Sequence, residues 1–131
     1  MTGLDTNVLV RYNMQDDAKQ AAQATRLVES LSAQAPGFVP VVAVAELVWV
    51  LGGCFDLQRA QVADAVEALL RSKEMLVERA EVVWQALRLF RAGSADFADG
   101  LVERSAAAAG CDRTVTFDRA AVKVCGMQLL G

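Results

Sequence analysis

The chain has 131 residues, of which 54% are hydrophobic, and its 13 Lys and Arg residues against 16 Asp and Glu residues give a formal net charge of −3. This length predicts a single domain spanning residues 1–131, and this apolar content is enough for a core without disulfides. The absence of histidine excludes Ser-His-Asp and Cys-His catalysis, and the negative net charge does not indicate nucleic-acid binding.

Signals for a membrane or for secretion are also missing from the sequence. No apolar run reaches the roughly 18 residues of a membrane span, and the first residues lack the pattern of a signal peptide. Cys54, Cys111 and Cys125 are odd in number and widely spaced, which is typical of free thiols. We therefore expect a cytoplasmic protein that does not associate with membranes.

Short apolar runs alternate with helical patterns along the chain. In chain order the pattern predicts strand 2–4, helix 8–13, helix 16–32, strand 38–39, helix 41–51, helix 58–71, strand 75–77, helix 80–90, helix 95–109, strand 114–117 and strand 127–130. Alternation of this kind is typical of an α/β fold. We expect a short, mostly parallel sheet of about five strands with helices on both faces.

Two of the predicted strands end directly in an aspartate, Asp5 and Asp118. Ligands of parallel α/β sheets bind at the carboxyl ends of the strands, so we expect the two carboxylates at one sheet edge. An aspartate after a strand is also typical of a turn or a helix N-cap, and that alternative stays open for each residue alone.

Glu46 is the only charged residue in the apolar segment 38–51. A helix that is apolar on all sides is expected to be buried, and a buried carboxylate needs a partner. The partner is either a buried arginine or a metal ion within an acidic cluster.

Asp96 and Asp99 stand three residues apart at the start of an Ala-rich helical segment, so their side chains are expected to share a face. Asp96 has the alternative role of an N-cap. Several converging carboxylates without histidine form an oxygen-only ligand set, which suits Mg²⁺ or Mn²⁺. Such a site activates water and neutralises charge on a phosphate, so phosphodiester hydrolysis is the expected chemistry.

The chain resembles a PIN domain of the VapC toxin type over nearly its whole length. The resemblance rests on four segments in order, namely Leu4–Leu9, Glu46 with the apolar residues 47–51, Ala95–Leu101 and Thr114–Arg119. It departs from many relatives after Leu101, where Val102-Glu103-Arg104 replaces a more apolar run.

The resemblance implies a Rossmann-like three-layer α/β/α sandwich and a Mg²⁺- or Mn²⁺-dependent endoribonuclease that acts as the toxin of a toxin–antitoxin pair. It also implies an RNA substrate, a VapB-like antitoxin partner and a homodimer. Asp5, Glu46, Asp99 and Asp118 fall on the family's acidic positions, and Asp96 would be an accessory metal ligand. The expected accessory residues are Thr6, Asn7 and Thr116, and the expected phosphate contacts are Arg11, Arg104, Arg113 and Arg119.

Two other functions remain open at this point. A PIN-fold interaction module without catalysis would keep the fold and act only by binding a protein partner. A haloacid-dehalogenase-like or receiver-like phosphotransfer domain also uses strand-end aspartates. However, Asp5-Thr6-Asn7 lacks a second Asp two residues on, and no lysine follows a predicted strand.

Overall fold

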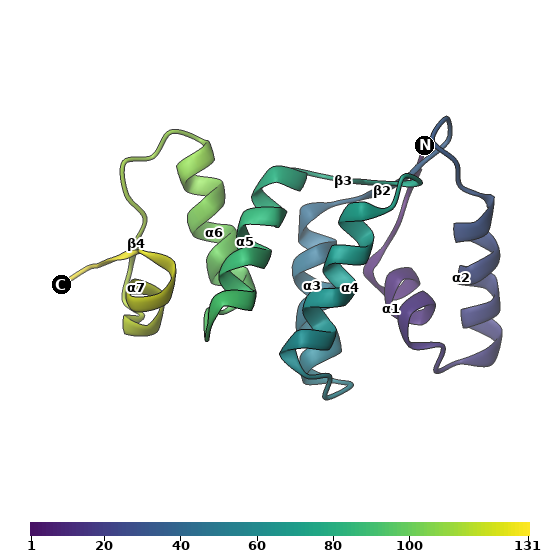
Figure 1. Ribbon diagram of the computed structural model, residues 1–131, viewed down its shortest axis with the longest axis horizontal. Helices are drawn as coiled ribbons and strands as arrows, with labels where there is room; N and C mark the ends of the chain where they lie inside the picture. Colours follow the sequence, from purple (N-terminus) through teal and green to yellow (C-terminus); the bar gives the residue numbers. More distant parts are fainter. The chain divides into compact units, whose positions relative to one another are not determined.

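The computed structural model describes all residues from 1 to 131, with seven helices and five short strands. The chain forms two compact units, Met1–Ala80 and Glu81–Gly131. The first unit runs from purple to teal in Figure 1 and the second from green to yellow. Each unit is described by itself.

A parallel sheet of three strands organises the first unit. In spatial order the strands are β1 (Thr2–Gly3), β2 (Gly37–Val39) and β3 (Met75–Val77). The central strand pairs with both neighbours, and Gly37 lies opposite both Thr2 and Met75. Parallel neighbours need long crossover connections, and helices supply them here.

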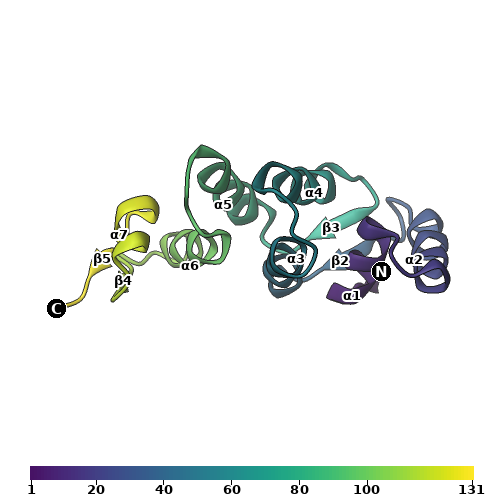
Figure 2. The same cartoon turned by 90° about the horizontal axis from the view of Figure 1, so that it is seen from below.

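Two helices connect each pair of neighbouring strands in the first unit. The helices α1 (Thr6–Met14) and α2 (Ala18–Ser30) lie between β1 and β2 in the chain, and α3 (Val41–Gly53) and α4 (Arg59–Arg71) lie between β2 and β3. The helix α1 packs against α2 and α3, and α3 packs against α4. Figures 1 and 2 both show α3 and α4 side by side.

The second unit is mainly helical. Its elements are α5 (Ala80–Ala92), α6 (Phe97–Ala108), β4 (Val115–Thr116), α7 (Arg119–Cys125) and β5 (Gln128–Leu129). The rings of Phe90 in α5 and Phe97 in α6 meet edge to face, with centroids 5.9 Å apart. The helix α7 packs against α6 and against the parallel pair β4–β5.

The observed strands lie within one or two residues of the predicted ones, and all of their pairings are parallel. Seven helices with short parallel strands are consistent with the expected three-layer α/β/α fold. None of the helices has the length and apolar character needed to cross a bilayer.

The sheet differs from the prediction, because the five strands form two sheets of three and two strands. The strands β1 and β4, which precede Asp5 and Asp118, belong to different units and to different sheets. Strands of two residues offer few backbone groups. Those of β4 bond to β5, where the N–H groups of Gln128 and Leu130 donate to the carbonyls of Thr114 and Thr116 at 2.8 Å each.

The helix α7 was not predicted. It has seven residues, which is too short to show a clear helical period in the sequence. Its ends nevertheless carry standard signals, since Asp118 is the N-cap and Gly126 ends the helix with a left-handed φ of 73°.

The helix α3 is less buried than its apolar sequence predicted. Its buried side chains are Ala43, Val44, Leu47 and Leu51. The opposite face is open, and Val42 and Trp49 are 64% and 71% exposed. The prediction of a helix buried on all sides was wrong, because a helix that packs along one face buries only about half of its residues.

This orientation of α3 can be tested by stability measurements. Leu47 has no exposed surface, so Leu47→Ala should lower the free energy of unfolding by about 2–5 kcal/mol. Val42→Ala, on the exposed face of the same helix, should change it by less than about 0.5 kcal/mol. Urea denaturation followed by circular dichroism measures both values. Equal losses in the two variants would contradict the orientation.

Candidate functional site

Asp5 lies directly after β1 and is held at the start of α1. It is the N-cap of that helix, and its Oδ1 accepts a hydrogen bond from the backbone N–H of Thr6 at 2.8 Å. The first N–H groups of a helix have no partner within the helix, so a carboxylate there is stabilised by the cap and by the helix dipole. The cap uses Oδ1 and leaves Oδ2 of Asp5 for other ligands.

Thr6 connects Asp5 to Glu46. Its hydroxyl Oγ1 donates a hydrogen bond to Oε1 of Glu46 at 2.7 Å, across 40 residues of sequence. This bond joins the first residue of α1 to the middle of α3, and it fixes one oxygen of the Glu46 carboxylate. The two acids and the hydroxyl therefore form one group, which supports the accessory role expected for Thr6.

The burial expected for Glu46 was wrong. The side chain is exposed, and no charged residue in the structure is buried. Its observed partner is the Thr6 hydroxyl, and neither a buried arginine nor a metal ion is needed to offset desolvation. The reason is the one-sided burial of α3, which leaves Glu46 on the same open face as Val42 and Trp49.

A cavity of about 470 Å³ lies beside this group in the first unit. It is lined by Asp5, Thr6, Asn7, Val10, Arg11, Asp16, Glu46, Val50 and Phe55. Asn7, which was expected to be an accessory residue, also lines this cavity.

Asp16 is a third carboxylate of this cavity, and sequence reasoning gave it only a role at the start of a helix. The observed N-cap of α2 is Asp17, whose Oδ1 accepts from the N–H of Gln20 at 2.9 Å. Asp16 instead pairs with Arg11, at 3.2 Å between Oδ2 and Nη1. The two adjacent aspartates carry the same local signal, so the sequence could not assign the two roles.

The second unit holds the other predicted acids. Asp96 is the N-cap of α6, and its Oδ1 accepts from the N–H of Asp99 at 3.0 Å. Asp118 is the N-cap of α7, and its Oδ1 accepts from the N–H of Ala120 at 2.9 Å. The N-cap alternative considered for each of these residues is therefore observed, and each keeps its Oδ2 outside the cap.

Asp99 lies among like charges in the first turn of α6. Partial burial, together with the negative charges of Asp96 and Asp118, raises the pKa of Asp99 above its ordinary value of 3.8. Repulsion of this kind is relieved by a proton or by a cation. Asp96, Asp99 and Asp118 thus form a second acidic group.

The hydroxyl of Thr116 serves the backbone rather than a carboxylate. Its Oγ1 accepts a hydrogen bond from the N–H of Asp118 at 3.0 Å. This bond fixes the turn from β4 into α7, and so it positions the Asp118 side chain indirectly.

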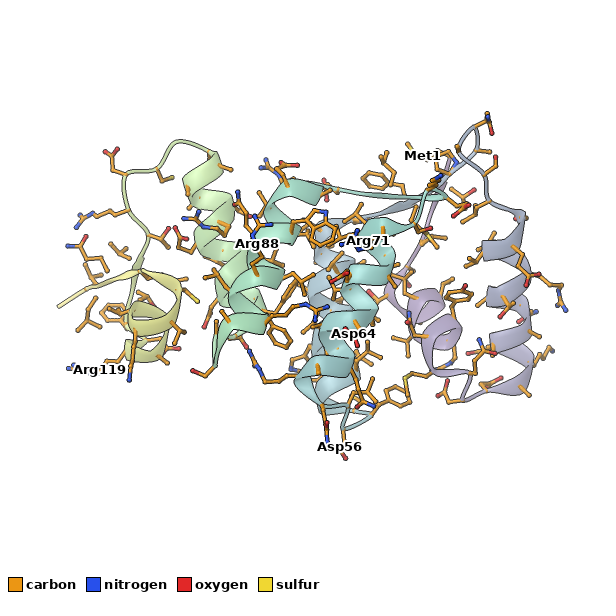
Figure 3. All side chains as sticks on the ribbon, viewed as in Figure 1. Met1, Asp56, Asp64, Arg71, Arg88 and Arg119 are labelled. Carbon is orange, nitrogen blue, oxygen red and sulfur yellow. The ribbon has the colours of Figure 1, made fainter.

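The four arginines expected near phosphates differ in their surroundings. Arg11 is held by Asp16 and by Gln20 Oε1 at 2.8 Å, and Arg104 is held by Glu103 at 2.6 Å. Arg113 donates to Oε1 of Gln128 at 3.1 Å. Arg119 begins α7, is exposed, and is labelled in Figure 3. Two of the four are therefore neutralised locally by a carboxylate.

The predicted acids occupy two groups, one in each compact unit. Asp5 and Glu46 belong to the first unit, and Asp96, Asp99 and Asp118 belong to the second. No three His, Cys, Asp or Glu side chains are grouped closely enough to hold a metal ion. The donor chemistry, oxygen ligands with mutual repulsion, suits a hard divalent cation.

The electrostatic origin of the Asp99 shift can be tested by NMR titration of its carboxyl carbon. Asp96→Asn keeps a capping side chain but removes a charge, so the pKa of Asp99 should fall toward 3.8. Because the pKa of Asp99 is higher in the folded protein than in the unfolded chain, the free energy of unfolding decreases as the pH rises from the unfolded pKa through the folded pKa. This decrease should be smaller in Asp96→Asn than in the wild type. Asp112→Asn, at an exposed aspartate of the same unit, is the control. A pKa of Asp99 unchanged by Asp96→Asn would contradict this origin.

Comparison with known protein families gives one match that agrees with the α/β fold. The PIN domain family matches residues 4–127, which covers nearly all of the chain. No curated protein matches the sequence. PIN domains are commonly nucleases that act on RNA and generally use divalent metal ions. Because the match covers this length, the chain belongs to the PIN domain family.

Proposed function

We propose that this protein is a metal-dependent endoribonuclease of the VapC toxin type, with residues 1–131 acting as one nuclease domain. The observation that carries the proposal is the hydrogen-bonded group of Asp5, Thr6 and Glu46, because it brings an exposed carboxylate that follows β1 and an exposed carboxylate of α3 into one group on a PIN fold. The repulsion at Asp99 supports it independently, because a cation would relieve that repulsion.

Each acid has a distinct role in the proposal. Asp5, Asp99 and Asp118 would hold a Mg²⁺ or Mn²⁺ ion, with Asp96 as an accessory ligand. When bound, the ion supplies an acidified water and neutralises charge on the phosphate. Glu46, whose Oε1 is fixed by Thr6, accepts the proton of the attacking water at Oε2.

A protein partner is part of the proposal. Val42 and Trp49 form an exposed apolar face on α3, on the same side as Glu46. Exposed apolar patches are typical of protein interfaces. This face supports binding of a VapB-like antitoxin that restrains the nuclease, and association of the chain as a homodimer. The same face favours the alternative of an interaction module without catalysis.

Cleavage assays on the purified protein, freed of any antitoxin, test the enzymatic proposal. With Mg²⁺ or Mn²⁺ the protein should cleave RNA, and Asp5→Asn or Asp99→Asn should lower the rate by roughly 100-fold or more, because each removes a charged ligand. Asp56→Asn is a matched control, since Asp56 lies in a loop with a left-handed φ of 54° that asparagine also adopts. Figure 3 shows Asp56 beyond the end of α3.

If the wild-type protein cleaves none of a broad set of RNAs, the nuclease proposal is overturned. Failure to bind Mn²⁺ by calorimetry together with inactivity would favour the interaction module. If Asp56→Asn lost as much activity as Asp5→Asn, loss of any carboxylate would have the same effect, and the result would not support a specific role for Asp5.

The role of Thr6 in orienting Glu46 has its own test. Thr6→Val keeps the shape but removes the hydroxyl that donates to Glu46, so kcat should fall by about 10- to 100-fold. Thr6→Ser restores a hydroxyl and should recover most of kcat, while KM for RNA should change little in either variant. A serine variant as slow as the valine variant would contradict this role.

A further inference from the structure

A second cavity, of about 600 Å³, lies entirely within the second unit and is not used by the proposed hydrolysis. It is built by α5, by α6 and by the carboxyl end of α7. Its volume falls within the range of sites that bind small molecules. The side chains that matter for its chemistry are Gln85, Arg88, Leu89, Glu103, Arg104 and Val124.

The inner wall of this cavity is apolar and well supported. Leu89 and Val124 are half-buried, and both pack against a buried cluster of Ala95, Ala121, Cys125 and Met127. Because the cluster fixes both side chains from behind, they offer a firm apolar surface to a ligand.

The outer wall carries a fixed guanidinium. Arg104 donates from Nε and Nη2 to the two carboxylate oxygens of Glu103, at 2.6 and 2.9 Å. This two-point contact holds the guanidinium plane in one orientation. The hydrogen bonds that Arg104 donates to Glu103 also raise the pKa of Arg104, so the group stays charged.

Two further polar side chains complete the outer wall. Gln85 is half-buried on α5 and offers both a donor and an acceptor. Arg88, one turn of helix later, is exposed, and Figure 3 labels it on α5.

The cavity adjoins the acidic group of the second unit. Asp99 and Glu103 stand four residues apart on α6, so they share one face of that helix. Cys125 lines the cavity, and its burial, together with the charges of Asp99, Asp96, Glu103 and Asp118, raises the pKa of its thiol. A ligand in the cavity would therefore lie next to a reactant held at Asp99.

We propose that this cavity binds the base of a ribonucleotide adjacent to the cleaved phosphodiester, and so contributes to sequence preference. The flat guanidinium of Arg104 stacks on the base, and Leu89 and Val124 contact its edge. Gln85 donates hydrogen bonds to the base and accepts them from it, Glu103 accepts from an N–H group of the base, and Arg88 contacts a phosphate. The inference rests on the proposed ribonuclease function.

Binding of short RNA without divalent metal tests this inference separately from cleavage. The probes are fluorescein-labelled, single-stranded six-nucleotide RNAs of A, C or U, measured by fluorescence anisotropy in EDTA. The wild-type chain should prefer one of them several-fold. Arg104→Ala should weaken binding of the preferred RNA by roughly tenfold and abolish the preference among the three probes. Arg104→Lys should fail to restore it, because lysine has no flat face for stacking.

A blocking variant and a control make the test independent of Arg104. Ala92 is exposed on the cavity wall, so Ala92→Trp should fill the cavity without removing a core side chain. This variant should therefore bind the preferred RNA more weakly than the wild type does. Arg26→Ala removes an exposed arginine from α2 and is the control for loss of charge alone. Circular dichroism melting confirms that each variant is folded.

The outcomes separate the two proposals. The base-binding inference is overturned if the wild type binds no probe or has no preference, or if both Arg104→Ala and Ala92→Trp behave like Arg26→Ala. A protein with a cavity-dependent preference that never cleaves RNA would overturn the nuclease proposal alone. If cleavage depends on Asp99 but the cavity variants bind RNA as the wild type does, only the base-binding inference is overturned.

Discussion

Three of the four aspartates in the proposed site are positioned by the hydrogen-bonding needs of helix starts. The first backbone N–H groups of α1, α6 and α7 lack partners within their helices, and Asp5, Asp96 and Asp118 accept from them. Each cap fixes a side chain through one oxygen. Capping and ligand binding are therefore compatible roles for the same carboxylate, because the second oxygen is not used in the cap.

Capping also explains why the acids were easy to find and hard to interpret in the sequence. An aspartate directly after a strand satisfies both the rule for N-caps and the rule for ligand sites in parallel sheets. Asp118 illustrates the ambiguity, because the short helix that it caps was not predicted, and so its structural role was not assigned. Asp16 and Asp17 show the same limit, since only the folded chain distinguishes the cap from the partner of Arg11.

The starts of the longer helices and the positions of the strands were predictable because their signals are local. The extent of burial was not, because it depends on which neighbours pack against a helix. The apolar sequence of α3 predicted a buried Glu46, yet only one face of the helix packs, and the acid is exposed with a hydroxyl partner from α1. The bond between Thr6 and Glu46 spans 40 residues, so no local pattern could reveal it. The division of the strands into two sheets is likewise a matter of long-range pairing.

The distribution of charge decides how a protein with a net charge of −3 can hold RNA. Two of the arginines near the family motifs are neutralised in place, Arg11 by Asp16 and Arg104 by Glu103. Attraction of phosphates by free positive charge is therefore weaker than the count of arginines indicates. Arg104 loses little as a recognition group by this pairing, because stacking uses the flat face of the guanidinium and the carboxylate occupies its edge. Contacts to bases, which depend less on net charge, are consequently the form of RNA recognition that this surface favours.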